Sequence, residues 1–193
     1  DPNIENIDLK NLNIKLKKGF IRVNEYMQTN IQNIYAIGDV SGPPLLAHVA
    51  SFEGTLAAEH MLGNKESPMK YDNIPSCTYT NPEVASVGLT EKDAISKGYD
   101  IKVGKFPFSA LGKTLAEGDR DGFVKIIFDA KYGELLGCHI IGKNATNLIS
   151  EISIARNLEA TFSELLNTIH PHPTLSEAIH EATADAFNEA IHI

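Results

Sequence analysis

The sequence has few cysteines, no tryptophan and no long apolar run. Its two cysteines, Cys77 and Cys138, have no second cysteine within a few residues, which excludes a closely spaced redox pair in this chain. No segment approaches the roughly 18 uninterrupted apolar residues of a membrane span. The first residues, Asp1-Pro2-Asn3, have neither the basic nor the apolar region of a signal peptide. Neither a membrane anchor nor a leader is therefore expected.

Positive charge is also scarce. The chain has 17 Lys and Arg against 25 Asp and Glu, a formal net charge of -8 and a pI near 5.3. A nucleic acid or an anionic membrane would meet a repulsive field, so neither is expected as a partner. The hydrophobic content of 42% is that of an ordinary soluble globular protein. At 193 residues, the chain has the length of one large domain or about one and a half typical ones.

Both cysteines lie in apolar, β-branched neighbourhoods. This environment predicts buried thiols in a reducing, cytoplasmic compartment. The sequence does not decide whether Cys77 and Cys138 form a bridge.

The most informative stretch is His170-Pro171-His172-Pro173-Thr174-Leu175-Ser176-Glu177. Pro173 fixes its own φ and disfavours a helical conformation at His172, so a stiff turn is expected to present this imidazole. Thr174 followed by Glu177 fits a capping box, with Thr174 as the N-cap. Apolar residues with helical spacing then predict a helix from Thr174 to about Ile191.

Three interpretations fit this turn. In the first, it only starts a helix, because capping boxes are common at helix starts. In the second, His172 and Glu177 form a dyad in which the carboxylate fixes the imidazole tautomer, as a general base near neutral pH requires. In the third, the turn binds a metal, but no further pattern completes a recognisable zinc site. The metal ligands would be His170, His172, Glu177 and His180, with Glu181 on the same helical face.

The first third of the chain contains short apolar segments that suggest parts of an open α/β sheet. Residues 9–16 suggest a short helix and a turn, and residues 20–23 suggest a brief strand. Residues 34–40 form an apolar run that predicts a strand of a parallel sheet, with Asp39 at its carboxyl end, where open α/β sheets place ligands. Gly-Asp also marks ordinary turns.

An Ala-rich amphipathic helix is expected next, from about Ala47 to Met61, closed by Gly63-Asn64. Its N-terminus follows Asp39 closely and can offer backbone N–H groups to an electron-rich ligand. The polar, proline-punctuated segment 65–74 predicts a domain boundary, which we place between residues 1–68 and residues 69–193.

From residue 75 onward, alternating or apolar runs predict strands that follow one another in the sequence. Strands are expected at 76–80, 84–89, 101–108, 123–128 and 135–141. Helices are expected at 91–97, at 145–157 and from 174. This order predicts an α+β domain with a mainly antiparallel sheet and helices on one side.

With these elements in place, the chain resembles the C-terminal part of the dihydrolipoamide dehydrogenase family, flavin components of 2-oxoacid dehydrogenase complexes and class I pyridine nucleotide-disulfide oxidoreductases. The matching pieces are NIYAIGDV, LAH, IPSCTYTNPEVASVG, VGKFPF and HPHPTLSEA, in the family's order. Related glutathione reductases generally lack the His-x before His-Pro-Thr, and mercuric reductases have a C-terminal cysteine pair.

The resemblance implies a role for each matched residue. His172 matches the catalytic base that takes a proton from the dihydrolipoyl thiol, and Glu177 matches its orienting carboxylate. Asp39 matches the residue bound to the ribityl chain of FAD. The flavin ring would lie against the backbone of Leu45, Leu46, Ala47 and His48, and the partner chain's flavin near His170 and Pro171. The resemblance also implies NAD as electron acceptor, a homodimer and a lipoyl domain as partner.

The family's flavin fingerprint, redox cysteines and most of its NAD-binding module precede the point where this sequence starts. We therefore expect the chain to be a remnant of the FAD/NAD-binding modules, residues 1–68, followed by a complete dimerisation domain. It is expected neither to turn over lipoamide nor to retain flavin. Two alternatives stay open: a non-catalytic dimerisation or docking module, and a related reductase such as glutathione or mercuric reductase.

Overall fold

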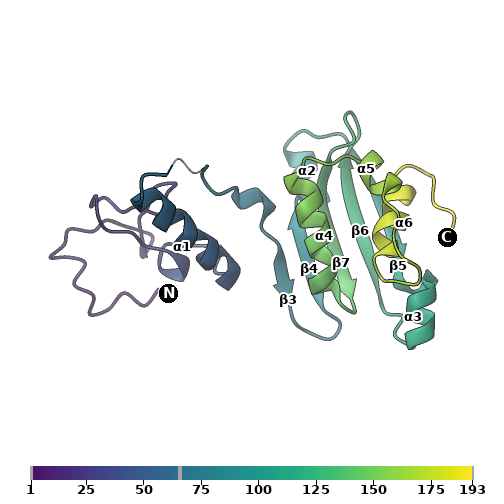
Figure 1. Ribbon diagram of the computed structural model, residues 1–193, viewed down its shortest axis with the longest axis horizontal. Helices are drawn as coiled ribbons and strands as arrows, with labels where there is room; N and C mark the ends of the chain where they lie inside the picture. Colours follow the sequence, from purple (N-terminus) through teal and green to yellow (C-terminus); the bar gives the residue numbers. More distant parts are fainter. Residues whose placement is uncertain (1, 65–66, 193) are drawn as a thin grey trace. The chain divides into compact units, whose positions relative to one another are not determined.

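The computed structural model describes residues 2–64 and 67–192 (Figure 1). The chain divides into two compact units, Asp1–Tyr71 and Asp72–Ile193. Lys65 and Glu66 of the expected linker lie outside the described residues. The module boundary after residue 68 stays a prediction.

The second unit is built on a five-stranded sheet with the order β3-β4-β7-β6-β5. All of its neighbouring strands run antiparallel. The strands are β3 (Ser76–Thr78), β4 (Val84–Gly88), β5 (Ile101–Pro107), β6 (Gly122–Asp129) and β7 (Leu135–Gly142). The predicted α+β fold class with a mainly antiparallel sheet is confirmed, and each strand lies where its apolar run predicted it.

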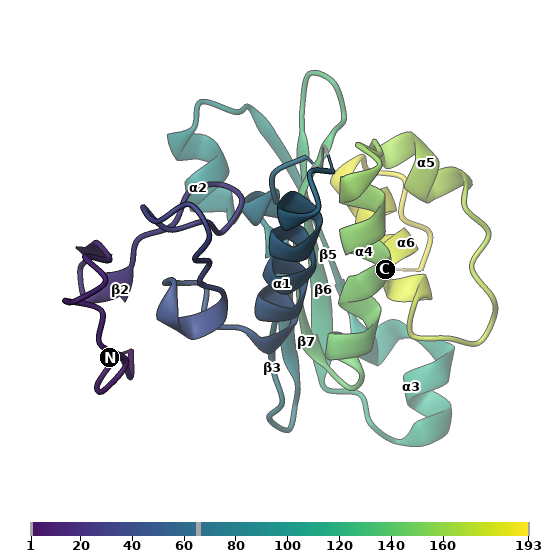
Figure 2. The ribbon, with the colours of Figure 1, turned by 60° about the vertical axis from the view of Figure 1, so that its left-hand side comes forward.

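Helices cover both faces of this sheet, so the prediction that they lie on one side is wrong. Because successive side chains of a strand point to opposite faces, Ile126 and Ile127 face different layers. Ile126 belongs to the main core with α4 (Ala145–Asn157) and α6 (Glu177–Ala186), whereas Ile127 packs with Ala94 of α2 (Glu91–Ser96). Figure 2 shows α4 and α6 on one side of the strands and α2 on the other.

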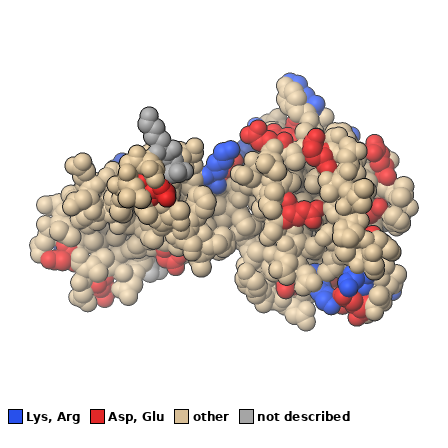
Figure 3. All heavy atoms as spheres, viewed as in Figure 1, with Lys and Arg blue, Asp and Glu red and all other residues tan. Residues whose placement is uncertain are grey.

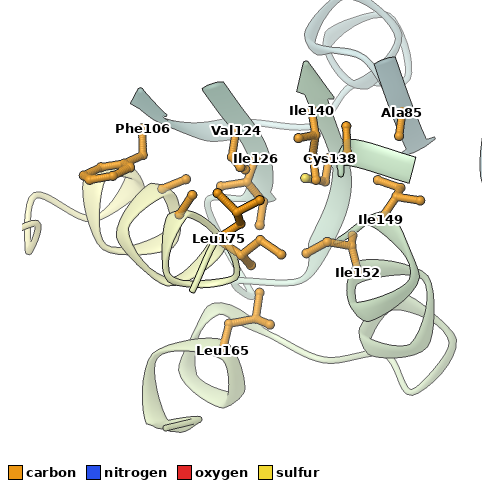
Figure 4. Close-up of a cluster of buried hydrophobic side chains, with 14 of the residues drawn as sticks. Ala85, Phe106, Val124, Ile126, Cys138, Ile140, Ile149, Ile152, Leu165 and Leu175 are labelled. Carbon is orange, nitrogen blue, oxygen red and sulfur yellow. The ribbon is translucent and has the colours of Figure 1, made fainter. Parts of the chain in front are cut away.

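The main core lies between the sheet and the pair α4 and α6, as Figure 4 shows. Ile149 and Ile152 of α4 and Ile179 of α6 are fully buried there. Each such side chain contributes about 1.5–3 kcal/mol of burial free energy, so this layer fixes both helices on the sheet. Two short helices missed by the sequence analysis, α3 (Gly112–Glu117) and α5 (Phe162–Asn167), follow β5 and α4 in sequence.

The approach of α6 to β5 depends on a glycine. A Cβ at Gly104 would lie 1.8 Å from the carbonyl oxygen of Ala182 and 2.6 Å from the backbone nitrogen of Ala186. The backbone N–H of Lys105 donates to Asp185 Oδ2 at 2.8 Å. The helix that carries Glu177 therefore rests directly on the strand backbone.

The predicted start and end of α6 are wrong. The helix begins at Glu177 and not after Thr174, because the Thr174 hydroxyl donates to the carbonyl oxygen of Pro171 at 2.7 Å instead of capping the helix. Only one of the two capping-box hydrogen bonds forms: the Thr174 N–H donates to the Glu177 carboxylate. The helix ends at Ala186, and Asn188 has a φ of 61°, which turns the chain before Ile191.

The first unit contains the hairpin of β1 (Leu16–Lys17) and β2 (Phe20–Ile21), the 3-10 helix η1 (Gly38–Val40) and helix α1 (Ala47–Met61). The expected bounds of α1 are confirmed. Of the short helix and turn predicted at residues 9–16, the turn is present and the helix is wrong, because positive φ at Asp8 and Asn13 interrupts a helical backbone.

The parallel strand predicted at residues 34–40 is also wrong. Tyr35 forms one isolated bridge with Gln28, and the chain then enters η1. A buried parallel strand needs hydrogen-bonded neighbours on both sides, and within residues 2–64 and 67–192 this segment has none beyond that bridge.

Acidic side chains are spread over the face shown in Figure 3, whereas basic ones gather in small groups. This distribution agrees with the net charge of -8. None of the helices in the described part of the chain has the length and apolarity needed to cross a membrane.

Candidate functional site

The centre of the candidate site is the contact between His172 and Glu177. His172 Nδ1 lies 2.8 Å from Glu177 Oε1. The backbone N–H of Thr174 donates to the other carboxylate oxygen, also at 2.8 Å. One carboxylate thus holds both the imidazole and the turn that bears it. The geometry of the predicted dyad is present, and the dyad lies entirely within the second unit.

The two partners differ in exposure. The side chain of His172 is 75% exposed, and that of Glu177 is 23% exposed. Burial by itself would raise the pKa of the Glu177 carboxyl, but the hydrogen bonds from the Thr174 N–H and from His172, together with the charges of His172 and His192, lower it overall. The carboxylate is therefore ionised near neutral pH and accepts from Nδ1–H, which leaves the Nε2 lone pair of His172 as a base.

The dyad lines a cavity of about 360 Å³. Leu111 and Gly112 form one wall, and the end of the chain, through Ile191 and His192, forms another. A Cβ at Gly112 would lie 3.6 Å from His172 Cε1, so this wall runs close to the ring. The cavity gives a small substrate access to the imidazole.

The other histidine of the turn, His170, does not share this role. His170 Nε2 lies 2.8 Å from Glu151 Oε1, and its Nδ1 lies 3.1 Å from the Thr168 carbonyl oxygen. Both partners are acceptors, so the two contacts together require an N–H on each ring nitrogen. The hydrogen bond with Glu151 raises the pKa of His170 in spite of burial. The side chain of His170 is therefore buried and engaged at both ring nitrogens, whereas Pro171 beside it is exposed.

The alternative metal site is not formed. Among the residues that the structure describes, no group of three or more His, Cys, Asp or Glu side chains is arranged to hold a metal ion. His170 is engaged by Glu151 on α4, and Glu181 pairs with His192 Nδ1 at 2.6 Å. The shared helical face of Glu177, His180 and Glu181 therefore serves other contacts.

The predicted flavin-contacting residues lie in the first unit. Asp39 is exposed within η1, and α1 begins at Ala47 with no side chain capping its first turn. Leu45, Ala47 and His48 are exposed and Leu46 is half-buried. An acidic acceptor beside an uncapped helix N-terminus suits a ligand that carries hydroxyl donors and electron-rich edges, so these residues fit a flavin.

Both cysteines are free. Cys138 is fully buried between the sheet and α4, and burial raises its pKa. Cys77 is half-buried, and burial followed by the charge of Glu83 raises its pKa as well. A raised pKa disfavours the thiolate, so neither cysteine has the environment of a redox nucleophile.

The family model for the pyridine nucleotide-disulphide oxidoreductase dimerisation domain matches residues 74–183. The chain belongs to the pyridine nucleotide-disulphide oxidoreductase family. A second model of this family matches residues 1–54. The resemblance inferred from the sequence motifs is thus confirmed, and the second unit is the family's dimerisation domain.

Similar proteins in this family share a name. The chain is 51% identical to the dihydrolipoyl dehydrogenase of Zymomonas mobilis and 52% identical to that of Bacillus subtilis, in each case over 98% of its own length. The solved structure of LpdA from Mycobacterium tuberculosis superposes with a TM-score of 0.88 at 30% identity, over 94% of this chain and 40% of that one. The chain spans about two fifths of the curated relatives, 41% and 40% of their lengths.

Sequence reasoning missed two features of the site. Glu151 is 19 positions from His170, and no local motif pairs them. Ile191 was expected in the C-terminal helix, but it lines the cavity together with His192. By contrast, the capping-box pattern did indicate that the Thr174 N–H donates to Glu177.

Proposed function

We propose that this chain is the C-terminal part of a dihydrolipoyl dehydrogenase, a flavin-dependent enzyme that reoxidises dihydrolipoamide with NAD. The observation that carries this proposal is the His172–Glu177 contact of 2.8 Å at the rim of a cavity. Relatives about half identical to the chain over nearly its whole length are named for this activity. If Glu177 only capped the start of a helix, its carboxylate would not need a hydrogen bond with the exposed imidazole of His172.

His172 acts as the general base. One substrate thiol gives its proton to Nε2, and the thiolate attacks the enzyme's disulfide, whose sulfur-sulfur bond breaks as a mixed disulfide forms. The second substrate thiol then displaces the enzyme sulfur. The products are the lipoyl disulfide and an enzyme dithiol, so two electrons and two protons leave the substrate. FAD, when bound, supplies the path of these electrons to NAD.

Glu177 acts on the base and not on the substrate. Its ionised carboxylate accepts from Nδ1–H, fixes the tautomer with Nε2 as proton acceptor, and stabilises the imidazolium after the proton has moved. The Thr174 N–H holds the carboxylate in place for both tasks.

The active site would form across a homodimer interface. The described surface near the dyad includes Ile169, 95% exposed, and Ile191, 80% exposed, which are apolar side chains that a partner subunit would cover. In this arrangement His172 serves the disulfide and flavin of the partner subunit, with Pro171 and the backbone of His170 toward that flavin. The substrate would be the lipoyl domain of a 2-oxoacid dehydrogenase complex, in the cytoplasm.

A second candidate function concerns the 193-residue chain by itself. Lacking a redox-suited cysteine among its two, it would serve as a dimerisation module without lipoamide turnover or retained flavin. Light scattering shows whether the chain dimerises, and a flavin absorbance band in the purified chain would contradict this expectation.

The test of the main proposal is a lipoamide–NAD assay on the full-length protein. His172→Ala is expected to lower turnover about 100-fold or more, the usual loss when a general base is removed. Flavin content, measured by absorbance, should stay at the wild-type level, because the residues proposed to hold the flavin, Asp39 and residues 45–48, lie in the first unit and are unchanged. Unchanged turnover in this variant would mean that the dyad is not catalytic.

A further inference from the structure

A buried carboxylate in the first unit has no role in the chemistry of the dyad. Glu53 lies on α1 and is 3% exposed. Both of its oxygens are engaged: Oε2 accepts from the backbone N–H of Gly38 at 2.7 Å, and Oε1 accepts from the hydroxyl of Tyr71 at 2.7 Å. A buried charge is costly unless it is hydrogen-bonded in this way.

Packing alone gives no reason for a glutamate at this position. Val49 and Ala57 lie one turn before and one turn after Glu53 on the same face of α1, and both are buried. An apolar side chain would continue this face without the cost of desolvating a carboxylate. The contacts of the carboxylate therefore explain its presence better than its volume does.

The contact with Gly38 acts on an unusual piece of backbone. Gly38 has a φ of 69°, and a Cβ at this position would lie 3.1 Å from Ala50 Cβ. Its carbonyl oxygen accepts from the N–H and from the hydroxyl of Ser41, each at 2.8 Å. Glu53 fixes the N–H side of the same residue. The backbone is thus held on both sides immediately before Asp39.

We propose that Glu53 is a positioning residue for flavin binding, which holds the Gly38–Val40 turn so that Asp39 and the first turn of α1 face one ligand. This inference rests on the proposed function, because it takes the ligand of Asp39 to be a flavin. Glu53 does not touch the flavin; it acts through the backbone of Gly38.

Tyr71 completes the arrangement. Its hydroxyl is the second donor to Glu53, and burial, followed by the hydrogen bond to Glu53 and its charge, raises the pKa of Tyr71. The hydroxyl therefore stays protonated and donating across the neutral range. Because the Tyr71 hydroxyl donates to Oε1 of Glu53, Oε2 accepts from the Gly38 N–H.

The test uses the full-length protein and two measurements. FAD affinity is measured by titrating the flavin-stripped protein, and exchange of the Gly38 amide by hydrogen–deuterium exchange. Glu53→Ala is expected to weaken FAD binding about 10-fold or more and to accelerate Gly38 exchange by a similar factor, which is the usual worth of a hydrogen bond to a charged group. Glu53→Met keeps the packing volume, so it gives the same result if the alanine variant does not fold.

Two further variants separate positioning from a general structural role. Glu53→Gln keeps an oxygen for Gly38 and an amide that can donate to the Tyr71 oxygen, so wild-type affinity and exchange are expected. Glu59→Ala removes a half-buried carboxylate from the same helix, one that accepts from the Asn64 side-chain amide and not from Gly38, and it is expected to change neither quantity.

Equal FAD affinity in the wild type, Glu53→Ala and Glu53→Met would overturn the inference, and so would a loss in Glu53→Gln as large as that in Glu53→Met. Faster Gly38 exchange with unchanged FAD affinity would also overturn it, because the turn would then be held for another reason. If the wild-type protein binds no FAD, the proposed function itself fails, and that result is distinct from a wild type that binds FAD and a Glu53→Met variant that binds it equally well.

Discussion

His170 and Glu151 form a partly buried pair whose histidine is two residues from the candidate base. Their contact of 2.8 Å joins the catalytic turn to α4, and the side chain of His170 is only 7% exposed. The two histidines of the turn thus have opposite tasks. His170 anchors the turn through Glu151, and the exposed His172 is the proposed proton acceptor.

The ion pair predicts a pH-dependent stability. The folded pKa of His170 is raised above its unfolded value of about 6.5, so its contribution is fully present below pH ~6.5 and is lost as the pH rises through the folded pKa. Glu151→Gln should therefore destabilise the protein more at pH 6 than at pH 9. Denaturant unfolding followed by circular dichroism measures this difference, with the exposed Glu159→Gln as control. A difference that does not vary with pH would contradict the assignment.

Gly104→Ala is expected to separate α6 from the sheet. The new Cβ would overlap the Ala182 carbonyl oxygen and the Ala186 nitrogen, which are backbone atoms that cannot rotate away. Overpacking of this kind costs about 1–3 kcal/mol or more. Thermal unfolding measures the loss. Gly54→Ala is the matched control, because its Cβ would meet only the flexible end of the Ile37 side chain, at 3.2 Å.

Glu177→Gln is expected to lower lipoamide turnover in the full-length protein by about 10- to 100-fold, less than the loss of His172 itself. The amide can still accept from the Thr174 N–H, but it supplies no charge to stabilise the imidazolium. Steady-state kinetics with lipoamide and NAD give the comparison, and Glu159→Gln should have wild-type turnover. Equal losses in Glu177→Gln and Glu159→Gln would show that the carboxylate does not support the base.

The two cysteines should differ in reactivity. Cys138 is 0% exposed, and burial raises the pKa of both thiols, so a maleimide should label Cys77 slowly and Cys138 only after unfolding. Mass spectrometry of the labelled 193-residue chain distinguishes the two sites. Rapid labelling of Cys138 under native conditions would mean that the core around β7 opens readily.

The sheet was predictable because its strands pair with neighbours within the chain. Apolar runs such as residues 123–128 and 135–141 appear as β6 and β7 within one or two residues of their predicted bounds. The strand predicted at residues 34–40 failed for the opposite reason, since an apolar run alone cannot form a parallel strand without partners beside it. The short helix predicted at residues 9–16 does not form, because the left-handed backbone at Asn13 interrupts a helical conformation.

At the site, local spacing was sufficient for His172 and Glu177, which are five positions apart on one turn. It was not sufficient for contacts between distant elements. Glu151 reaches His170 only because α4 and the turn pack on the same face of the sheet, and Glu53 reaches Gly38 from a later helix. The roles of these side chains depend on tertiary structure, and local motifs do not indicate them.

The hydrogen bonds of His170 have a consequence for chemical labelling. An acylating reagent directed at histidine attacks a ring nitrogen that has an unshared electron pair. Both nitrogens of His170 carry hydrogens toward Thr168 and Glu151, whereas His172 offers Nε2. Of these two neighbouring imidazoles, only His172 should therefore react. The rate of its modification would report the accessibility of its Nε2 without any substrate present.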